Sequence, residues 1–373
     1  MMPRARFGLA LVACGLLLGG CDSPAGPGER APLSVIVAGR LERGSTIHVS
    51  AARGDVALSP ANVTYSFDPA DAVQPLGGDS VRLVRAGTVS VVVTVKGESA
   101  TQALAVAVPP SIVFDRVANG NRDIWRVALD GGELTQITTD LADDLDPTVA
   151  AGRLVFVSFR ADRNAELFSM PLAGGAATRI TTSATNESAP ALSRDGSRLA
   201  YALDVAGVTK LFRAAGDGSG RAQALASSAE AVESSPSWAP ADGSLVFMST
   251  VNGTADLFEL PLAGTATQLV GGNSADVEPA VSGDGRFVAF ASTRSGNDGA
   301  DIFVLRRSDG QIVRLTNRAA SEGQPAWTAD GRLVYTEFGA DGGRLRWVDP
   351  AAPGVIHEID TGAGSARNPS SIP

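Results

Sequence analysis

Hydrophobic and polar residues alternate in short runs along most of the chain. Between Leu33 and Val108 the runs are SVIVA, TIHVS, VTYSF, SVRLV, SVVVTV and ALAVAV, and turn residues separate them. A period of two over about five to seven residues is typical of half-buried strands. The succession of such runs predicts a β-sandwich over residues 33–109.

A longer repeat follows. Proline recurs at spacings of 43 to 46 residues, at Pro147, Pro190, Pro236, Pro279, Pro325 and Pro369. After each of the first five come a turn with glycine and an apolar strand such as RLVFVS. A further strand carries an aliphatic and aromatic pair in five places, such as Leu167-Phe168, and the unit closes with a short apolar run such as TRITT. Four strands in about 44 residues is the size of one propeller blade. We therefore predict an all-β chain, with a six-bladed β-propeller over residues 110–373.

The two ends of this repeat region complement each other. The segment from Ser111 to Thr139 has the later strands of a unit but no proline strand, whereas the C-terminal ARNPSSIP has only the proline strand. We expect these segments to form one sheet together, because such pairing removes exposed strand edges.

The repeats have a specific family resemblance. The segments PSWAPADGSLVFMS, PAVSGDGRFVAFAS with ADIFVL, and PAWTADGRLVYTE resemble the blade repeat of TolB-like propellers, and the resemblance spans residues 111–373. The segments VTYSFDPADAV and VRLVRAGTVSVVVTVKG are similar to bacterial immunoglobulin-like domains, which usually carry tryptophan where Tyr65 stands. These resemblances imply a propeller that binds proteins, preceded by a spacer or adhesive module. Because TolB has another type of N-terminal domain, membership of a Tol complex does not follow.

The first residues have the pattern of an export signal. Arg4 and Arg6 precede an apolar run from Phe7 to Leu18, and Leu18-Gly19-Gly20-Cys21 resembles the bacterial lipobox. The resemblance implies cleavage of residues 1–20 and a lipid on the thiol of Cys21; the alternative is an ordinary signal peptide that happens to contain a cysteine. Residues 21–32 are rich in proline and glycine, which predicts a flexible tether. We expect a lipid-anchored protein of the cell envelope, periplasmic or outer-membrane facing, with either membrane possible.

Charge and cysteine content narrow the possible partners. The chain has 40 acidic and 31 basic residues and a formal charge of −9, without a basic stripe for a nucleic acid backbone. Its two cysteines are Cys14 and Cys21, so removal of the leader would leave no internal disulfide. We expect a monomer, attached to the membrane through the lipid, that binds an envelope protein or peptide.

One set of residues is a candidate binding site. An acid lies three residues before the proline in five of the six units, and these acids are Asp144, Glu187, Glu233, Asp276 and Glu322. A negative collar at the channel mouth could bind a cation or a basic peptide. The alternative is structural, with each carboxylate accepting backbone N–H bonds in a turn. The acidic run TDLADDLDP also has two interpretations. It is either a calcium site or a solvated acidic loop.

The residues for catalysis are few. The histidines are His48 and His357, and the chain has no G-x-S-x-G motif and no cluster of cysteine and histidine for zinc. We therefore predict a binding scaffold, not an enzyme, without a cofactor, although calcium is possible. The alternative is a metal-dependent propeller enzyme, or a receptor for a small ligand or glycan, that uses the acidic collar.

Overall fold

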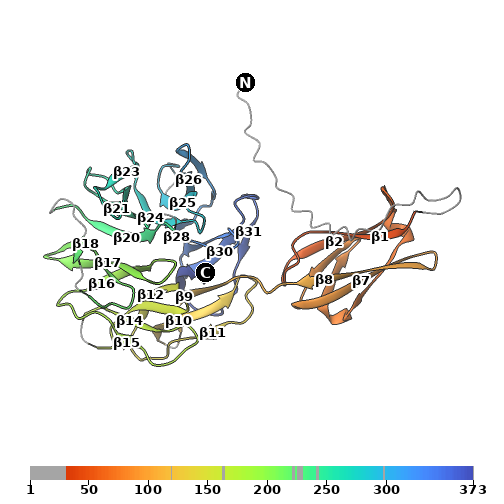
Figure 1. The fold of residues 1–373 in the computed structure, drawn as a ribbon, viewed down its shortest axis with the longest axis horizontal. Coiled ribbons are helices and arrows are strands. Elements are labelled where there is room, and N and C mark those ends of the chain that lie inside the picture. Colours follow the sequence, from red (N-terminus) through yellow and green to blue (C-terminus); the bar gives the residue numbers. More distant parts are fainter. Residues whose placement is uncertain are drawn as a thin grey trace, which may run out of the picture. The chain divides into compact units, whose positions relative to one another are not determined.

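The computed structural model describes residues 31–118, 120–161, 164–220, 223–224, 230–240, 243–296 and 299–372. The signal peptide, Cys21 and the tether up to residue 30 lie outside the described residues. The chain divides between Pro109 and Pro110 into two compact units. Strands form nearly all of the regular structure (Figure 1). Within the described part of the chain, no helix is both long enough and apolar enough to cross a membrane.

The first unit consists of two antiparallel sheets that share one core. One sheet has the order β1-β2-β6-β5, with β3 paired to β2; the other has the order β4-β7-β8. The bounds are β1 Leu33–Ala38, β2 Thr46–Arg53, β3 Val56–Ala57, β4 Thr64–Asp68, β5 Val73–Gly77, β6 Ser80–Leu83, β7 Gly87–Val95 and β8 Glu98–Val106, with single 3-10 turns at Pro60–Asn62 and Ala70–Ala72. Alternate residues of β7, such as Val91 and Val93, are fully buried against Ile47 and Leu104 of the other strands. The alternation in the sequence thus marks the face of each strand that forms the core.

The second unit contains six four-stranded antiparallel sheets among its described residues. We number them along the chain. The first sheet has the order β11-β10-β9-β32, with β9 Ser111–Ala118, β10 Asn121–Ala128, β11 Thr135–Gln136 and β32 Ala366–Ser371. The expected pairing of the C-terminal segment with the first sheet is confirmed, because Ala366 lies opposite Arg116 of β9.

The other five sheets each use four consecutive strands. Their bounds are β12 Asp144–Ala150, β13 Arg153–Ser158, β14 Glu166–Pro171 and β15 Thr178–Arg179 in the second sheet; β16 Glu187–Leu192, β17 Arg198–Val205, β18 Val208–Ala215 and β19 Gln223–Ala224 in the third; β20 Glu233–Trp238, β21 Leu245–Ser249, β22 Asp256–Leu260 and β23 Thr267–Val270 in the fourth; β24 Asp276–Val281, β25 Phe287–Ser292, β26 Asp301–Arg306 and β27 Gln311–Arg314 in the fifth; and β28 Ser321–Trp327, β29 Leu333–Gly339, β30 Gly342–Val348 and β31 Ile356–Glu358 in the sixth.

The proline-containing strand is the innermost strand of each sheet. These strands contact one another in turn, in the order β12, β16, β20, β24, β28 and β32, and β32 also contacts β12. Hydrophobic cores lie between neighbouring sheets and use residues of both, as with Phe156 and Val113 between the second and first sheets. A further core joins the sixth sheet to the first, with Val334 and Leu345 against Ile112 and Phe114. The first strands therefore surround a central channel.

The aromatic residue of the predicted aliphatic–aromatic pair packs within its own sheet. Phe156 stacks on Phe168 of the next strand at a centroid distance of 6.2 Å, and Phe290 stacks on Phe303 at 6.0 Å. Such offset stacking stabilises a pair of strands beyond the area that it buries. The repeat in the sequence is thus a repeat of the contacts between second and third strands.

Candidate functional site

A β-bulge interrupts the innermost strand of every sheet of the second unit. In β24, for example, the pairing register with β25 shifts between Val277 and Ala280, which leaves Glu278 and Pro279 out of the ladder. The residue before each proline has a left-handed backbone, with φ between 48° and 54°. A bulge tolerates proline because the missing N–H is not needed for pairing. The six residues in this position, which we call the pre-proline ring, are Asp146, Ala189, Ser235, Glu278, Gln324 and Asn368.

The bulges turn these side chains toward the channel. The pre-proline ring and the six prolines line a cavity of about 280 Å3, the pre-proline cavity. The same prolines and the residues that follow them line a second cavity of about 290 Å3, the mouth cavity. Because the two cavities share the prolines, the ring of prolines separates a layer of polar side chains from the mouth.

Side chains of the pre-proline ring bind the backbone of the next sheet. The N–H of Ala189 donates to Asp146 Oδ2 at 3.4 Å, the N–H of Gln324 to Glu278 Oε2 at 2.7 Å, and the N–H of Asn368 to Gln324 Oε1 at 3.0 Å. Asn368 Nδ2 also donates to the buried carboxylate of Asp115 at 2.6 Å. A long polar side chain at one bulge thus fixes the backbone at the following bulge.

Two carboxyl groups, those of Asp146 and Glu278, line the pre-proline cavity. Burial and the neighbouring carboxylate of Asp115 raise the pKa of Asp146 to about 6, and burial raises the pKa of Glu278 as well. The lining of this cavity includes no basic side chain. At neutral pH, therefore, this layer disfavours further negative charge.

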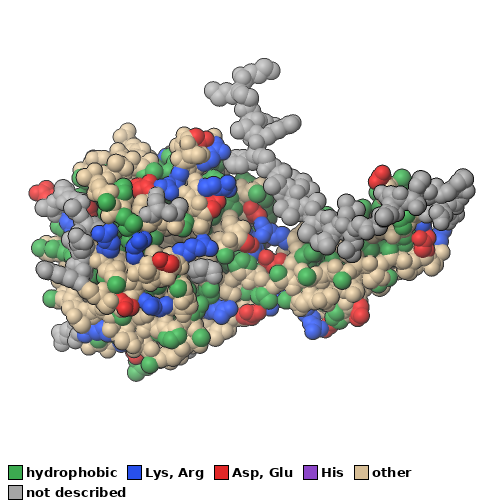
Figure 2. All heavy atoms as spheres, in the orientation of Figure 1, with side chains coloured by type: hydrophobic (Ala, Val, Ile, Leu, Met, Phe, Trp, Pro, Cys, Tyr) green, Lys and Arg blue, Asp and Glu red, His purple; other side chains and the backbone are tan. Residues whose placement is uncertain are grey.

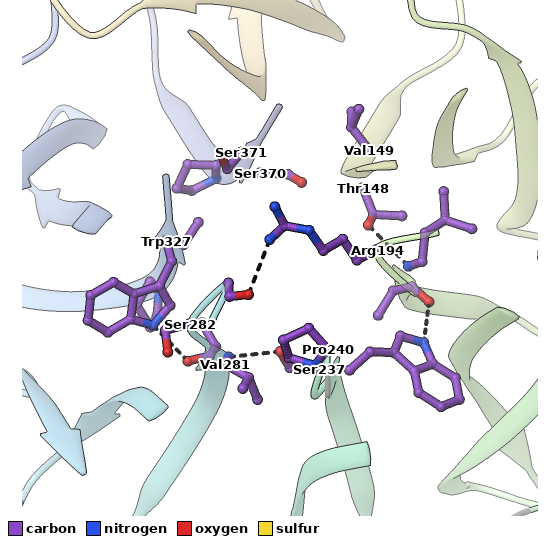
Figure 3. A pocket seen from close by; sticks show the side chains of 18 of the residues that line it. Thr148, Val149, Arg194, Ser237, Pro240, Val281, Ser282, Trp327, Ser370 and Ser371 are labelled. Atoms are coloured by element: carbon purple, nitrogen blue, oxygen red, sulfur yellow. Dashed lines mark hydrogen bonds between the residues drawn. The ribbon is translucent and has the colours of Figure 1, made fainter. Parts of the chain in front are cut away.

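The mouth cavity has the opposite character. Arg194 is the single charged residue among the described residues of its lining, and all six sheets contribute to its walls. Figure 3 shows the Arg194 side chain extended across the opening, where Nη1 donates to the carbonyl oxygen of Gly283 at 3.3 Å. The indole N–H groups of Trp238 and Trp327 donate to backbone carbonyls of the preceding sheets at 3.0 and 2.9 Å. The walls are thus fixed, and the guanidinium is exposed above them.

The five acids expected at the channel mouth lie elsewhere. Each is almost fully buried, with exposed fractions of 0 to 2% for Asp144, Glu187, Glu233, Asp276 and Glu322, and none lines either cavity. The expected location was wrong because each acid comes before the bulge, within the regular start of the strand, where its side chain points into the sheet stack. Their role in ligand binding stays a prediction.

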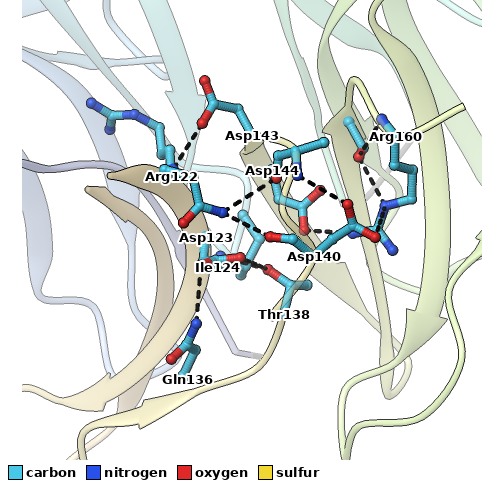
Figure 4. Close-up of polar contacts among 12 residues, drawn as sticks. Arg122, Asp123, Ile124, Gln136, Thr138, Asp140, Asp143, Asp144 and Arg160 are labelled. Carbon is cyan, nitrogen blue, oxygen red and sulfur yellow. Dashed lines mark hydrogen bonds and ion pairs between the residues drawn. The ribbon is translucent and has the colours of Figure 1, made fainter. Parts of the chain in front are cut away.

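The partners of these acids are within the protein. Asp144 forms an ion pair with Arg160 at 2.5 Å (Figure 4), and Asp276 forms one with Arg294 at 2.6 Å. Glu187 accepts hydrogen bonds from the hydroxyl of Thr181 and from the N–H of Leu167, the latter at 3.2 Å. Glu233 accepts from the N–H of Leu211 at 3.4 Å. These contacts support the structural alternative, in which the carboxylates tie neighbouring strands together.

Glu187 and Glu322 are the most perturbed of this set. Burial, together with the nearby acid Glu166 or Asp301, raises the pKa of each to about 7. The hydroxyl of Thr316 hydrogen bonds to Glu322 as that of Thr181 does to Glu187. Both glutamates therefore hold protons near neutral pH.

The acidic run of residues 140–146 does not form a cluster. Asp143 accepts from the N–H of Arg122 at 2.8 Å, and Asp140 accepts from the N–H of Ala142 at 3.0 Å (Figure 4). Asp144 is buried, and Asp146 lines the pre-proline cavity. In the described part of the chain, no three histidine, cysteine, aspartate or glutamate residues are placed to hold a metal ion. In the first unit, His48 lies on the surface, where its Nδ1 is 3.0 Å from the hydroxyl of Ser80.

Sequence reasoning missed Arg194 and the pre-proline ring. The ring residues differ in type from repeat to repeat, so they form no visible pattern. The usable signal was their fixed position directly before each proline, since a bulge there exposes one side chain to the channel. On the surface, acidic and basic side chains are interspersed on the face of the second unit that Figure 2 shows.

Comparison with known proteins agrees with this geometry. The family model for the TolB beta propeller domain matches residues 217–349. The structure of TolB from Acinetobacter baumannii is similar at a TM-score of 0.63 and 15% identity, over 84% of this chain and 85% of that chain. A chain of the nidogen/laminin complex gives a TM-score of 0.56 at 12% identity, over 70% and 98% of the two chains. None of the curated proteins matches this chain in sequence. The second unit thus has a TolB-like propeller fold.

Proposed function

We propose that this protein is a lipid-anchored scaffold of the cell envelope, which binds a protein partner at the mouth of its propeller channel. One observation carries the proposal: side chains from all six sheets converge on a mouth cavity whose lining includes no histidine or cysteine. Because a fold by itself does not specify a function, the function has to be argued from the site. A cavity with this lining is suited to the recognition of a partner. The proposal therefore assigns binding and not catalysis.

The proposal includes a closed, six-bladed propeller. The pairing of β32 with β9 and the core that joins the sixth sheet to the first support this closure. The first unit, with two sheets around one core, would be an immunoglobulin-like spacer between the anchor and the propeller.

The anchor can be tested by labelling. Cells that express the full chain would be grown with radioactive palmitate, and the protein would be isolated and its label measured. We expect labelled wild-type protein, unlabelled Cys21→Ser and labelled Cys14→Ser, because Cys14 lies in the leader that is removed. Label that persists in Cys21→Ser would contradict the lipid anchor.

The binding role can be tested by crosslinking in the native envelope, with captured proteins identified by mass spectrometry. Ala329 is exposed at the turn between β28 and β29 and lines the mouth cavity, so Ala329→Trp should obstruct it. Ala340 is exposed at the turn between β29 and β30, at the other end of β29. We expect one specific partner, lost in Ala329→Trp and retained in the control Ala340→Trp. Capture of no specific protein, or capture insensitive to Ala329→Trp, would argue against a scaffold that uses this mouth.

A further inference from the structure

Among the described residues that line the mouth cavity, one is positively charged and none is negatively charged. This is unexpected in a chain with 40 acidic and 31 basic residues. The charge belongs to Arg194, four residues after Pro190. The residues in the same position of the next three repeats are Pro240, Gly283 and Ala329, which are uncharged. The guanidinium is therefore a feature of one repeat and not of the fold.

The opposite rim is shaped to receive this side chain. Arg194 belongs to the third sheet and Gly283 to the fifth, so the side chain passes the fourth sheet and reaches across the opening (Figure 3). A Cβ atom at residue 283 would lie 2.7 Å from Arg194 Nη1. The missing side chain of Gly283 thus leaves the space in which the guanidinium rests.

The resting contact is weak enough to be exchanged. It is a hydrogen bond of 3.3 Å to a neutral carbonyl oxygen, made by an exposed side chain. A carboxylate would accept two parallel hydrogen bonds from the same guanidinium and would neutralise its charge. Arg194 therefore has more to gain from an incoming carboxylate than it loses at Gly283.

The rest of the channel limits how far an anion can enter. Beyond the prolines lies the pre-proline cavity, with the carboxylates of Asp146 and Glu278 in its lining. A negatively charged group is attracted to Arg194 at the mouth and repelled by the deeper layer.

From these observations we propose that Arg194 recognises a carboxylate in the mouth cavity, carried on an extended acidic segment of the protein partner. This inference rests on the proposed function and names the chemistry of its ligand. The proline and tryptophan walls would contact the apolar part of the segment, and the guanidinium would select its acidic residue.

The test uses the full lipidated chain in detergent and two five-residue peptides with both ends blocked. One peptide has a central glutamate and the other a central glutamine; binding is measured by ligand-observed NMR titration, which reads millimolar affinities. We expect the glutamate peptide to bind about tenfold more tightly, because a charge-assisted hydrogen bond is stronger than a neutral one. In Arg194→Gln the two peptides should bind equally, and Arg194→Lys should keep part of the preference.

Gly283→Ala gives an independent check. The added methyl group displaces the end of a flexible side chain and should leave the fold intact. It should keep or strengthen the preference for glutamate, since it removes the internal contact of the guanidinium. Equal binding of both peptides by the native protein, or an unchanged preference in Arg194→Gln, would overturn the proposal. Loss of partner capture in Ala329→Trp without loss in Arg194→Gln would overturn it as well, while leaving the scaffold role in place.

A competition experiment distinguishes a small free carboxylate from the side chain of a protein segment as the ligand. If succinate at the same concentration competes fully with the glutamate peptide, the ligand is a small anion and the assignment to a protein segment is wrong. If only the peptide binds measurably, the assignment holds. These measurements need no identified partner, so failure of the capture experiment does not decide them.

Discussion

A residue in the left-handed region normally costs free energy unless it is glycine or asparagine. The pre-proline ring places six residues in this region, and only Asp146 and Asn368 are of types that are enriched there. Three members use their side chains to accept the N–H of the next bulge, which offsets part of this cost. Ala189 has no side-chain acceptor for such a bond.

Substitutions of Ala189 should show how the cost of the left-handed backbone and the gain from a side-chain hydrogen bond affect stability. Ala189→Asn should stabilise the protein by about 0.5–1 kcal/mol, since asparagine tolerates positive φ and brings an amide oxygen toward the next bulge. Ala189→Val should destabilise it by about 1–2 kcal/mol, because a β-branched residue is strained there. Both changes can be measured by urea unfolding. Equal effects of the two substitutions would contradict this account of the bulge.

Buried carboxylates at the starts of first strands make the stability depend on pH. The pKa of Glu187 rises from an ordinary value of 4.5 to about 7 on folding, mainly through burial. The folded state therefore binds this proton more tightly than the unfolded state. The resulting stability is complete below the unfolded pKa and is lost as the pH rises through about 7.

Glu187→Gln should remove this dependence. At pH 8 the variant should be more stable than the native protein by on the order of 1–3 kcal/mol, and near pH 5 the two should be nearly equal. Thermal unfolding followed by circular dichroism at several pH values measures the difference. Asp341→Asn, which removes an exposed charge, serves as the control and should change little at any pH. A parallel pH profile for Glu187→Gln and native protein would refute the assignment.

At the scale of elements, one short strand connects the ends of the second unit. β32 pairs with β9, buries Ala366 completely and brings Asn368 to the carboxylate of Asp115. Without it, β9 would have an unpaired edge and the buried Asp115 would lose a donor.

Deletion of residues 366–373 should therefore lower the melting temperature sharply, with a loss of several kcal/mol that is typical when a buried network is broken. Deletion of Pro373 alone is the matched control and should have little effect. Differential scanning calorimetry reports both. If the longer deletion melted at the native temperature, β32 would not hold the first sheet in place.

The sequence pattern predicted second and third strands well, because their apolar runs are buried over nearly their whole length; RLVFVS, for example, is β13. It missed β5, whose sequence VQPLG contains Pro75 and Gly77 and shows no alternation; pairing with β6 makes this segment a strand. The channel residues could not be read directly. A bulge changes which residue faces the channel by one position, so the acids three residues before each proline became buried while the residues next to proline lined the cavity.

At the scale of the whole molecule, the two units have separate cores on either side of the boundary at Pro109 and Pro110. Each core is formed by strands of its own unit. Cooperative unfolding is expected within a core, so the two units should unfold independently.

We therefore expect two thermal transitions in the full chain. The transition of the propeller should stay within a few degrees of its position when residues 33–109 are removed, because no buried strand is lost from it. Calorimetry of both proteins tests this expectation. A shift of the propeller transition by ten degrees or more would show that the units stabilise each other.

The repeated bulge gives the channel a different side chain from each repeat on a similar backbone. Each repeat contributes one side chain to the pre-proline ring, and the ring reads Asp, Ala, Ser, Glu, Gln and Asn along the chain. The backbone is nearly the same at all six positions, so side chains of different size and charge occupy equivalent places, and three of them also hold the next bulge. Substitutions in the ring would therefore change the polarity and charge of the channel one position at a time, while the bulges keep each side chain directed at the channel.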